Sequence, residues 1–319
     1  MQHHTRRYLQ LSLVFAIAAV IASAQPYAYV ANFSGGNIAV INRATDTVTS
    51  TISLGLPSYA AGLALSPDGT LLYVAAMSSN QVSIISTATR TVVGKVIVGN
   101  SPVQVAFSPN GAYVYVVNQG SNSVSVISTA TRTVVATVQV GQTPTSIAIT
   151  PDGSRVLVTN RSSHTVTAIN AATHSVTATW PALLGTSGVV VSPDGNLAYV
   201  VNQYANAVTV HSVLTGAILE TIPGFVSPVG IAISPNGSRL YVTNVNAQSL
   251  STVDTLLKKI TATSPVGLFP TSVAVSHDGS MVYVTASYGY SVSAVNSLTH
   301  AVATIPRVGF LPMYIALSK

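Results

Sequence analysis

The 319-residue sequence contains no cysteine and few charged side chains. Without cysteine the chain can form neither disulfides nor thiolate metal sites. Only 6% of the residues are charged, against roughly 25% in a typical soluble domain. After the first 24 residues no apolar run approaches the roughly 20 residues that a membrane-spanning helix needs. The apolar residues come instead in short alternating bursts with Thr, Tyr and Ser, a pattern typical of β-strands.

Acidic residues are scarcer than basic ones, with 7 Asp and Glu against 13 Lys and Arg. The formal net charge is +6, but the basic residues are scattered along the chain and form no run. Nucleic-acid binding requires clustered cations. We therefore expect no nucleic-acid partner.

The few acids and histidines do not form a recognisable catalytic or metal-binding pattern. Four of the acids lie in turns of the Pro-Asp-Gly type, where an Asp side chain stabilises the turn: Asp68, Asp152, Asp194 and Asp278. Acid-base catalysis by two carboxylates needs both at one place, and zinc needs three or four converging ligands. The histidines after residue 24 are scattered over different parts of the chain. We therefore expect no catalytic residue, no metal site and no cofactor.

Residues 1–24 have the three parts of a signal peptide. A basic start is followed by an apolar run from Leu11 to Ala22, and Ala22-Ser23-Ala24 forms a cleavage site. The apolar run is too short to span a bilayer comfortably. We expect cleavage after Ala24, a single domain over 25–319, and a secreted, periplasmic or cell-surface protein without a transmembrane segment.

Three sequence markers repeat in phase about every 42 residues. A Ser or Thr before a Pro-Asp/Asn-Gly turn marks Ser66, Ser108, Thr150, Ser192 and Ser234, and a variant begins at Ser276. A Tyr-Val-x-Asn pattern falls at Tyr29, Tyr73, Tyr115, Leu157, Tyr199, Tyr241 and Tyr283. An apolar residue opens a further strand at Ile38, Val82, Val124, Val166, Val208, Leu250 and Val292. Repeats of this period indicate a solenoid, array or propeller.

Each repeat contains four strand signals joined by short turns. In residues 102–140 the strands are expected at Val103–Phe107, Tyr113–Val117, Val124–Ile127 and Val134–Val140. Short connections favour an antiparallel meander, which is the form of a propeller blade. The first strand of each repeat should lie nearest the axis, because the position four before the serine is mostly small, as in Gly62, Ser146 and Gly188.

The two ends of the chain hold complementary fragments of one repeat. The N-terminal fragment begins with a second strand near Tyr27–Asn32, and the chain ends with a lone first strand at Met313–Ser318. Pairing them closes a ring and removes the open strand edges. We therefore predict an all-β, seven-bladed β-propeller of four-stranded antiparallel blades, with the N- and C-terminal strands sharing one blade.

The pattern from Ile231 to Asn244, Ile-Ala-x-Ser-Pro-Asn-Gly followed by Leu-Tyr-Val-x-Asn, resembles the YVTN family of propeller repeats. The resemblance covers the whole chain after the leader. It implies an exported, surface-layer-like protein, with lactonase-type propellers and the propeller domains of periplasmic redox enzymes as broader relatives. It implies a fold more than an activity, because one fold carries many functions.

Two sets of residues are candidates for binding on the loop-rich face around the channel. The first is a ring of amides at the ends of the second strands: Asn118, Asn160, Asn202 and Asn244. Each amide could instead hydrogen-bond its own loop. The second is an irregular cluster near the closure: Phe33, Tyr59, Met77, Phe269, Tyr288, Tyr290, Phe310 and Tyr314. These residues could form a binding surface or pack over the closing blade.

The function that we infer from the sequence is an exported, non-enzymatic binding scaffold for a protein, peptide or glycan. Two alternatives stay open: a lactonase-like propeller hydrolase and an accessory propeller of a periplasmic redox system. A hydrolase would need acids, histidines or a metal near the channel.

Overall fold

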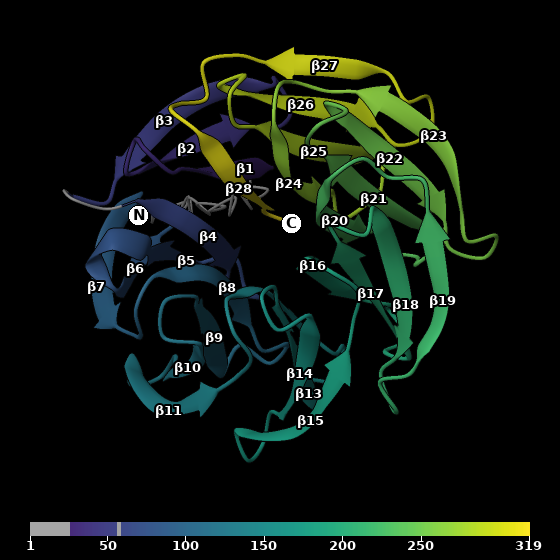
Figure 1. The fold of residues 1–319 in the computed structure, drawn as a ribbon. Coiled ribbons are helices and arrows are strands. Elements are labelled where there is room, and N and C mark those ends of the chain that lie inside the picture. Colours follow the sequence, from purple (N-terminus) through teal and green to yellow (C-terminus); the bar gives the residue numbers. More distant parts are fainter. Residues whose placement is uncertain (1–25, 56–58) are drawn as a thin grey trace, which may run out of the picture.

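The computed structural model describes residues 26–55 and 59–319, and it confirms the predicted ring. Seven four-stranded antiparallel sheets surround a central axis (Figure 1). The expected signal peptide lies outside the described residues. In the described part of the chain, no helix is long and apolar enough to cross a membrane.

The composite blade consists of β28 (Pro312–Leu317), β1 (Tyr27–Asn32), β2 (Asn37–Asn42) and β3 (Thr47–Ser53). Blade 2 contains β4 (Ala60–Leu65), β5 (Leu71–Ala76), the short 3-10 helix η1 (Met77–Ser79), β6 (Gln81–Ser86) and β7 (Thr91–Ile97). Blade 3 contains β8 (Pro102–Phe107), β9 (Tyr113–Asn118), β10 (Ser123–Ser128) and β11 (Thr133–Gln139). Blade 4 contains β12 (Pro144–Ile149), β13 (Arg155–Asn160), β14 (Thr165–Asn170) and β15 (Ser175–Pro181).

Blade 5 contains β16 (Thr186–Val191), β17 (Leu197–Asn202), β18 (Ala207–Ser212) and β19 (Ile218–Pro223). Blade 6 contains β20 (Pro228–Ile233), β21 (Arg239–Asn244), β22 (Ser249–Asp254) and β23 (Lys259–Pro265). Blade 7 contains β24 (Pro270–Val275), β25 (Met281–Ala286), β26 (Ser291–Asn296) and β27 (Val302–Ile305). The first strand of every blade lies nearest the axis, as predicted (Figure 1).

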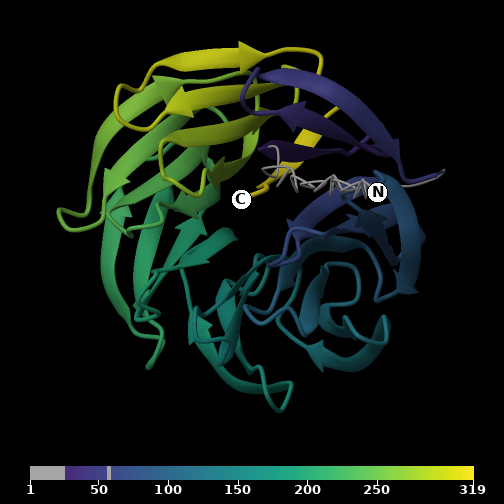
Figure 2. The same ribbon diagram turned by 180° about the vertical axis from the view of Figure 1, so that it is seen from behind.

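The ring is closed by pairing between the two ends of the described chain. Strand β28 runs antiparallel to β1, with Val30 opposite Ile315 and Ala28 opposite Leu317. The Tyr27 amide donates a hydrogen bond to the Ser318 hydroxyl at 2.8 Å. Seen from behind, β28 lies against β1 in the same way (Figure 2). The composite blade therefore has the same four-stranded order as its neighbours.

The repeated turn between the first and second strands is held by its own side chains. In blade 4 the Asp152 carboxylate accepts hydrogen bonds from the Thr150 hydroxyl, from the Ser154 amide at 3.0 Å and from the Ser154 hydroxyl at 2.8 Å. These hydrogen bonds lower the pKa of Asp152 to about 2, and the bond from Thr150 has the largest effect. Gly153 has a φ of 72°, which disfavours a side chain there. The turn acid therefore has a structural role, as predicted.

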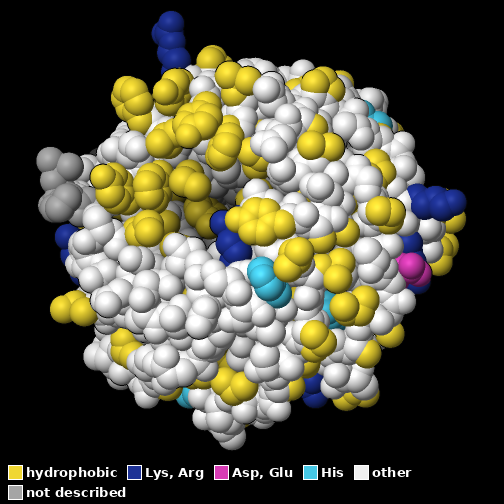
Figure 3. Space-filling view, viewed as in Figure 1, with side chains coloured by type: hydrophobic (Ala, Val, Ile, Leu, Met, Phe, Trp, Pro, Cys, Tyr) yellow, Lys and Arg dark blue, Asp and Glu magenta, His cyan; other side chains and the backbone are white. Residues whose placement is uncertain are grey.

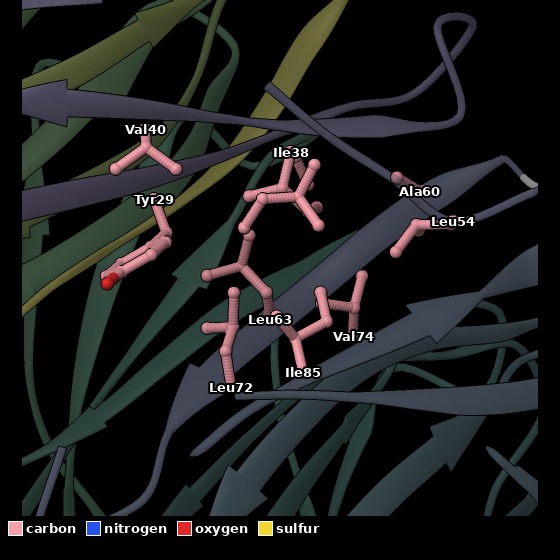
Figure 4. Packing of buried hydrophobic residues seen from close by; sticks show 11 residues of the cluster. Tyr29, Ile38, Val40, Leu54, Ala60, Leu63, Leu72, Val74 and Ile85 are labelled. Carbon is pink, nitrogen blue, oxygen red and sulfur yellow. The ribbon is translucent and has the colours of Figure 1, made fainter. Parts of the chain in front are cut away.

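The apolar core lies between adjacent blades rather than within one sheet. Between the composite blade and blade 2, Ile38 and Val40 pack against Leu63, Leu72 and others (Figure 4). A second-strand tyrosine supplies the largest buried side chain of several blades, as Tyr115 and Tyr241 do. Each blade thus depends on both neighbours for burial, which makes closure of the ring an energetic requirement.

A central channel as the candidate functional site

A cavity of about 900 Å³ runs along the propeller axis. Its walls come from the innermost strands of the blades and from loops that follow their second strands. The face shown in Figure 3 is hollowed at its centre, where basic side-chain atoms meet hydrophobic ones. Cavities of a few hundred to about 1,000 Å³ are typical of small-molecule sites.

One layer of the wall comes from the position four before the repeat serine. Six of its seven members line the cavity: Gln104, Ser146, Gly188, Gly230, Ser272 and Tyr314. A Cβ added to Gly188 would lie 2.8 Å from the Val229 carbonyl oxygen of the neighbouring blade, so the strands converge too closely there for a larger residue. The small residue at this position thus lets two neighbouring inner strands approach closely, as the predicted need for small residues at the axis requires.

A second layer comes from the residue directly after the second strand of each blade. Six of these seven positions line the cavity: Phe33, Met77, Gln119, Arg161, Gln203 and Val245. The seventh, Ser287, donates a hydrogen bond to the Pro312 carbonyl at 2.8 Å instead. Going round the ring, blades 3 to 5 supply polar side chains, and blade 6, the composite blade and blade 2 supply apolar ones. The channel wall is therefore amphipathic.

Arg161 is the only charged side chain among the described residues of the channel wall. Its Nη2 donates a hydrogen bond to the Gln203 side-chain oxygen. Its guanidinium carbon lies 5.8 Å from the centre of the Tyr204 ring, close enough for a cation–π interaction. Its Nε is buried without a hydrogen-bond partner in the described structure. The arginine is thus partly desolvated and only partly satisfied.

Tyr314 is the one large side chain in the axial layer that elsewhere holds Gly, Ser or Gln. Burial raises the pKa of Tyr314 to about 12, while the charge of Arg161 acts in the opposite direction. Its phenol is therefore a neutral hydrogen-bonding group near neutral pH. The ring packs against apolar residues of the composite blade and blade 2, and so narrows the apolar side of the channel.

The predicted ring of amides does not lie on the channel wall. Asn118, Asn160, Asn202 and Asn244 are buried, and none of them lines the cavity. Each Nδ2 donates a 2.9 Å hydrogen bond to a hydroxyl of the neighbouring third strand: to Ser125, Thr167, Thr209 and Ser251, respectively. The structure therefore places these four amides inside their blades and not around the channel mouth. The amides join two strands of their own blade, because the last residue of the second strand points into the blade.

The predicted aromatic cluster divides into a wall and a rim. Phe33, Met77, Phe269 and Tyr314 line the cavity. The remaining members contact them or each other. Tyr59 stacks on Phe33 with 4.8 Å between ring centres. Tyr288 lies tilted against Phe269 at 4.7 Å, and Tyr290 meets Phe310 edge to face at 5.8 Å. Tyr59, Tyr288, Tyr290 and Phe310 keep 46% to 68% of their surface exposed. Hydrophobic side chains accordingly gather beside the central hollow, over the composite blade and its neighbours (Figure 3).

The described channel wall contains no Asp, Glu, His or Lys. Over residues 26–55 and 59–319, no three His, Asp or Glu side chains are close enough to hold one metal ion. The polar groups of the wall are amides, hydroxyls and one guanidinium. Such groups can orient and hold a ligand, but none is a general base near neutral pH.

Sequence reasoning missed Arg161, Gln119, Gln203 and Tyr204. The first three each follow the repeat asparagine directly, so they occupy equivalent positions in three consecutive repeats. The signal was available: at this position the residues differ from blade to blade, whereas the asparagine before them recurs.

Comparisons with known proteins agree with the fold. A family model described as "Lactonase, 7-bladed beta-propeller" matches residues 44–140 and again 100–180, together less than half of the chain. No curated protein matches the sequence.

Solved structures resemble the whole propeller at low sequence identity. A protein of unknown function from Desulfotomaculum acetoxidans has a TM-score of 0.80 at 16% identity, over 91% of this chain and 98% of its own. Hydrazine synthase from Kuenenia stuttgartiensis has a TM-score of 0.77 at 22% identity, over 85% and 92%. A proposed 6-phosphogluconolactonase from Bacteroides uniformis has a TM-score of 0.77 at 18% identity, over 92% and 100%. These likenesses establish the seven-bladed fold.

Proposed function

We propose that this protein is a non-enzymatic binding propeller that holds a small ligand in its central channel. The observation that carries the proposal is the amphipathic wall, with Gln119, Arg161 and Gln203 on one side and Phe33 and Met77 on the other. Ligand sites combine a mostly apolar surface with a few placed polar groups. A wall that only filled space between blades would not place a partly desolvated arginine beside a cavity of about 900 Å³.

The aromatic rim extends this site outward. Tyr59, Tyr288, Tyr290 and Phe310 are rigid, amphipathic side chains on the loops around the composite blade and blade 7. Aromatic surfaces of this kind suit the body of a ligand that protrudes from the channel, or a peptide or glycan attached to it.

The partial match to the lactonase family model favours a hydrolase as the second candidate. Hydrolysis of a lactone requires an activated water, and the described channel wall offers no carboxylate or imidazole to activate it. Binding therefore accounts for the wall better than hydrolysis does.

An export route completes the proposal: cleavage after Ala24 would deliver the propeller outside the cytoplasm, and N-terminal sequencing of the native protein tests it.

The proposal is tested by identifying the small molecules that remain bound to the protein through purification. The natively purified protein is denatured, and the released small molecules are identified by mass spectrometry, in parallel with a Gln119→Trp variant whose indole would obstruct the channel mouth. We expect a compound near one equivalent from the wild type that the variant lacks. Identical extracts from both proteins contradict the proposal. Turnover of a lactone or ester panel by the wild type, and not by the variant, would establish the hydrolase instead.

A further inference from the structure

The polar half of the channel wall carries a positive charge that nothing in the described structure neutralises. Over residues 26–55 and 59–319 one ion pair is formed, between Lys258 in the turn before β23 and Glu220 on β19. Arg161 has no carboxylate among the described residues that line the cavity with it. A partly desolvated guanidinium without a counter-ion is unfavourable, and an anionic ligand group would relieve that cost.

The hydrogen-bonding capacity of Arg161 is also incompletely used. Gln203 accepts from Nη2, and Nε has no partner. A guanidinium has five N–H donors in a planar fork, which matches the two oxygens of a carboxylate. Gln119 stands at the equivalent position of the preceding blade and can donate from its amide nitrogen. This part of the wall therefore consists mainly of donors.

The amount of charge limits the kind of anion. One guanidinium balances one negative charge, whereas a phosphate monoester carries close to two at neutral pH. The described channel wall has no second cation. A monocarboxylate is therefore a better match than a phosphate ester.

The opposite side of the channel requires an apolar ligand body. Phe33, Met77, Phe269 and Tyr314 face the same cavity from the composite blade, blade 2 and blade 7. Phe33 and Phe269 are each held in an aromatic pair, which fixes their rings before a ligand arrives. A ligand that satisfies both sides has a carboxylate at one end and an aromatic or aliphatic body at the other.

We propose that the channel selects small organic monocarboxylates with an apolar body, and that Arg161 receives the carboxylate. This inference rests on the proposed function, since it names the ligand class of the same channel. It adds a specificity residue, Arg161, and assigns the aromatic wall to the ligand body.

The experiment measures calorimetric binding of naphthylacetate, of its neutral near-isostere naphthylacetamide, and of naphthyl phosphate. Hydrogen bonds to charged groups contribute about 1.5–3 kcal/mol, so the carboxylate should bind about 10- to 150-fold more tightly than the amide. Arg161→Gln should lose that preference and bind the two compounds alike. Arg161→Lys, which keeps the charge but not the fork, should fall between the two, and it serves as the second variant should Arg161→Gln fail to fold. Arg132→Gln is the matched control, because it removes the same charge from an exposed outer turn, and it should leave both affinities unchanged.

The outcomes distinguish a failure of this inference alone from a failure of the proposed function. Equal wild-type affinity for acid and amide, or a preference for the phosphate, overturns the monocarboxylate class while channel binding stands. Absence of wild-type binding to all three compounds also overturns it. Carboxylate binding that survives both Arg161→Gln and Gln119→Trp would place the ligand outside the channel, and both proposals would then fail.

Discussion

Replacing Ile315 with Ala tests whether the last strand contributes as much stability as a strand inside the chain. Ile315 lies in the middle of β28, is 7% exposed, and packs into the core shared by the composite blade and blade 7. The substitution removes three carbon groups, worth about 0.8 kcal/mol each by transfer. A residual cavity adds to this, so we expect a loss of about 3 kcal/mol in the free energy of unfolding.

The matched control is Ile147→Ala at the equivalent position of β12. Ile147 is 6% exposed, and its strand lies inside the continuous chain. The two substitutions should therefore lower the unfolding free energy by similar amounts. A second control, Ile97→Ala, changes a side chain that is 80% exposed and should alter it by less than about 0.5 kcal/mol.

Urea unfolding followed by tryptophan fluorescence measures all three variants. The single tryptophan, Trp180, is 4% exposed on β15, across the ring from β28 (Figure 1). A shifted midpoint at this distant probe reports that the ring unfolds as a unit. A loss below about 0.5 kcal/mol for Ile315→Ala, with the full loss for Ile147→Ala, would refute the closure argument.

Three further predictions concern other parts of the ring. Deletion of Leu311–Lys319 should lower the Trp180 unfolding midpoint more than Ile315→Ala does, because β1 loses its partner strand; an unchanged midpoint would show that β28 is dispensable. Burial lowers the pKa of His211 from its usual 6.5, so its contribution to stability is complete above pH 6.5 and is lost as the pH falls through the lowered value. In His211→Asn the unfolding free energy should therefore decrease less between pH 7 and pH 5 than in the wild type. An equal decrease in both proteins would contradict the assignment of this pH dependence to His211. Asn202→Ala should destabilise by about 1–3 kcal/mol in urea unfolding, because it removes the hydrogen bond to Thr209, and should leave naphthylacetate affinity unchanged; weakened binding would restore the amides as ligand contacts.

The sequence was sufficient to predict the ring because the fold follows from the repeat. The turn at Thr150–Gly153 and the buried second strand recur at a fixed spacing, and the fragment Tyr27–Asn32 lacks the first strand that Met313–Ser318 supplies. Strand pairing and closure require only these local signals. Successive residues of a strand face opposite sides of the sheet, so an inner strand that is apolar at nearly every position packs against both neighbouring blades.

The channel wall was harder to predict because it depends on a one-residue difference in register. Asn160 ends β13 and points into its blade, whereas Arg161 begins the following loop and lines the cavity. Side chains along a strand point alternately to its two faces. The sequence alone does not show at which residue the strand, and with it this alternation, ends. The aromatic cluster could be proposed from the sequence because Phe33 and Phe269 interrupt the repeat, but its division into a channel wall and a rim could not. The polar side was missed because Gln119 and Gln203 resemble ordinary loop residues.

A crystal structure of the protein with naphthylacetate tests the ligand site most directly. The account predicts carboxylate oxygens within about 3 Å of the Arg161 guanidinium nitrogens, and the naphthyl rings against Phe33 and Phe269 inside the channel. Density for the compound elsewhere on the propeller, or in the channel with the carboxylate directed away from Arg161, would contradict it.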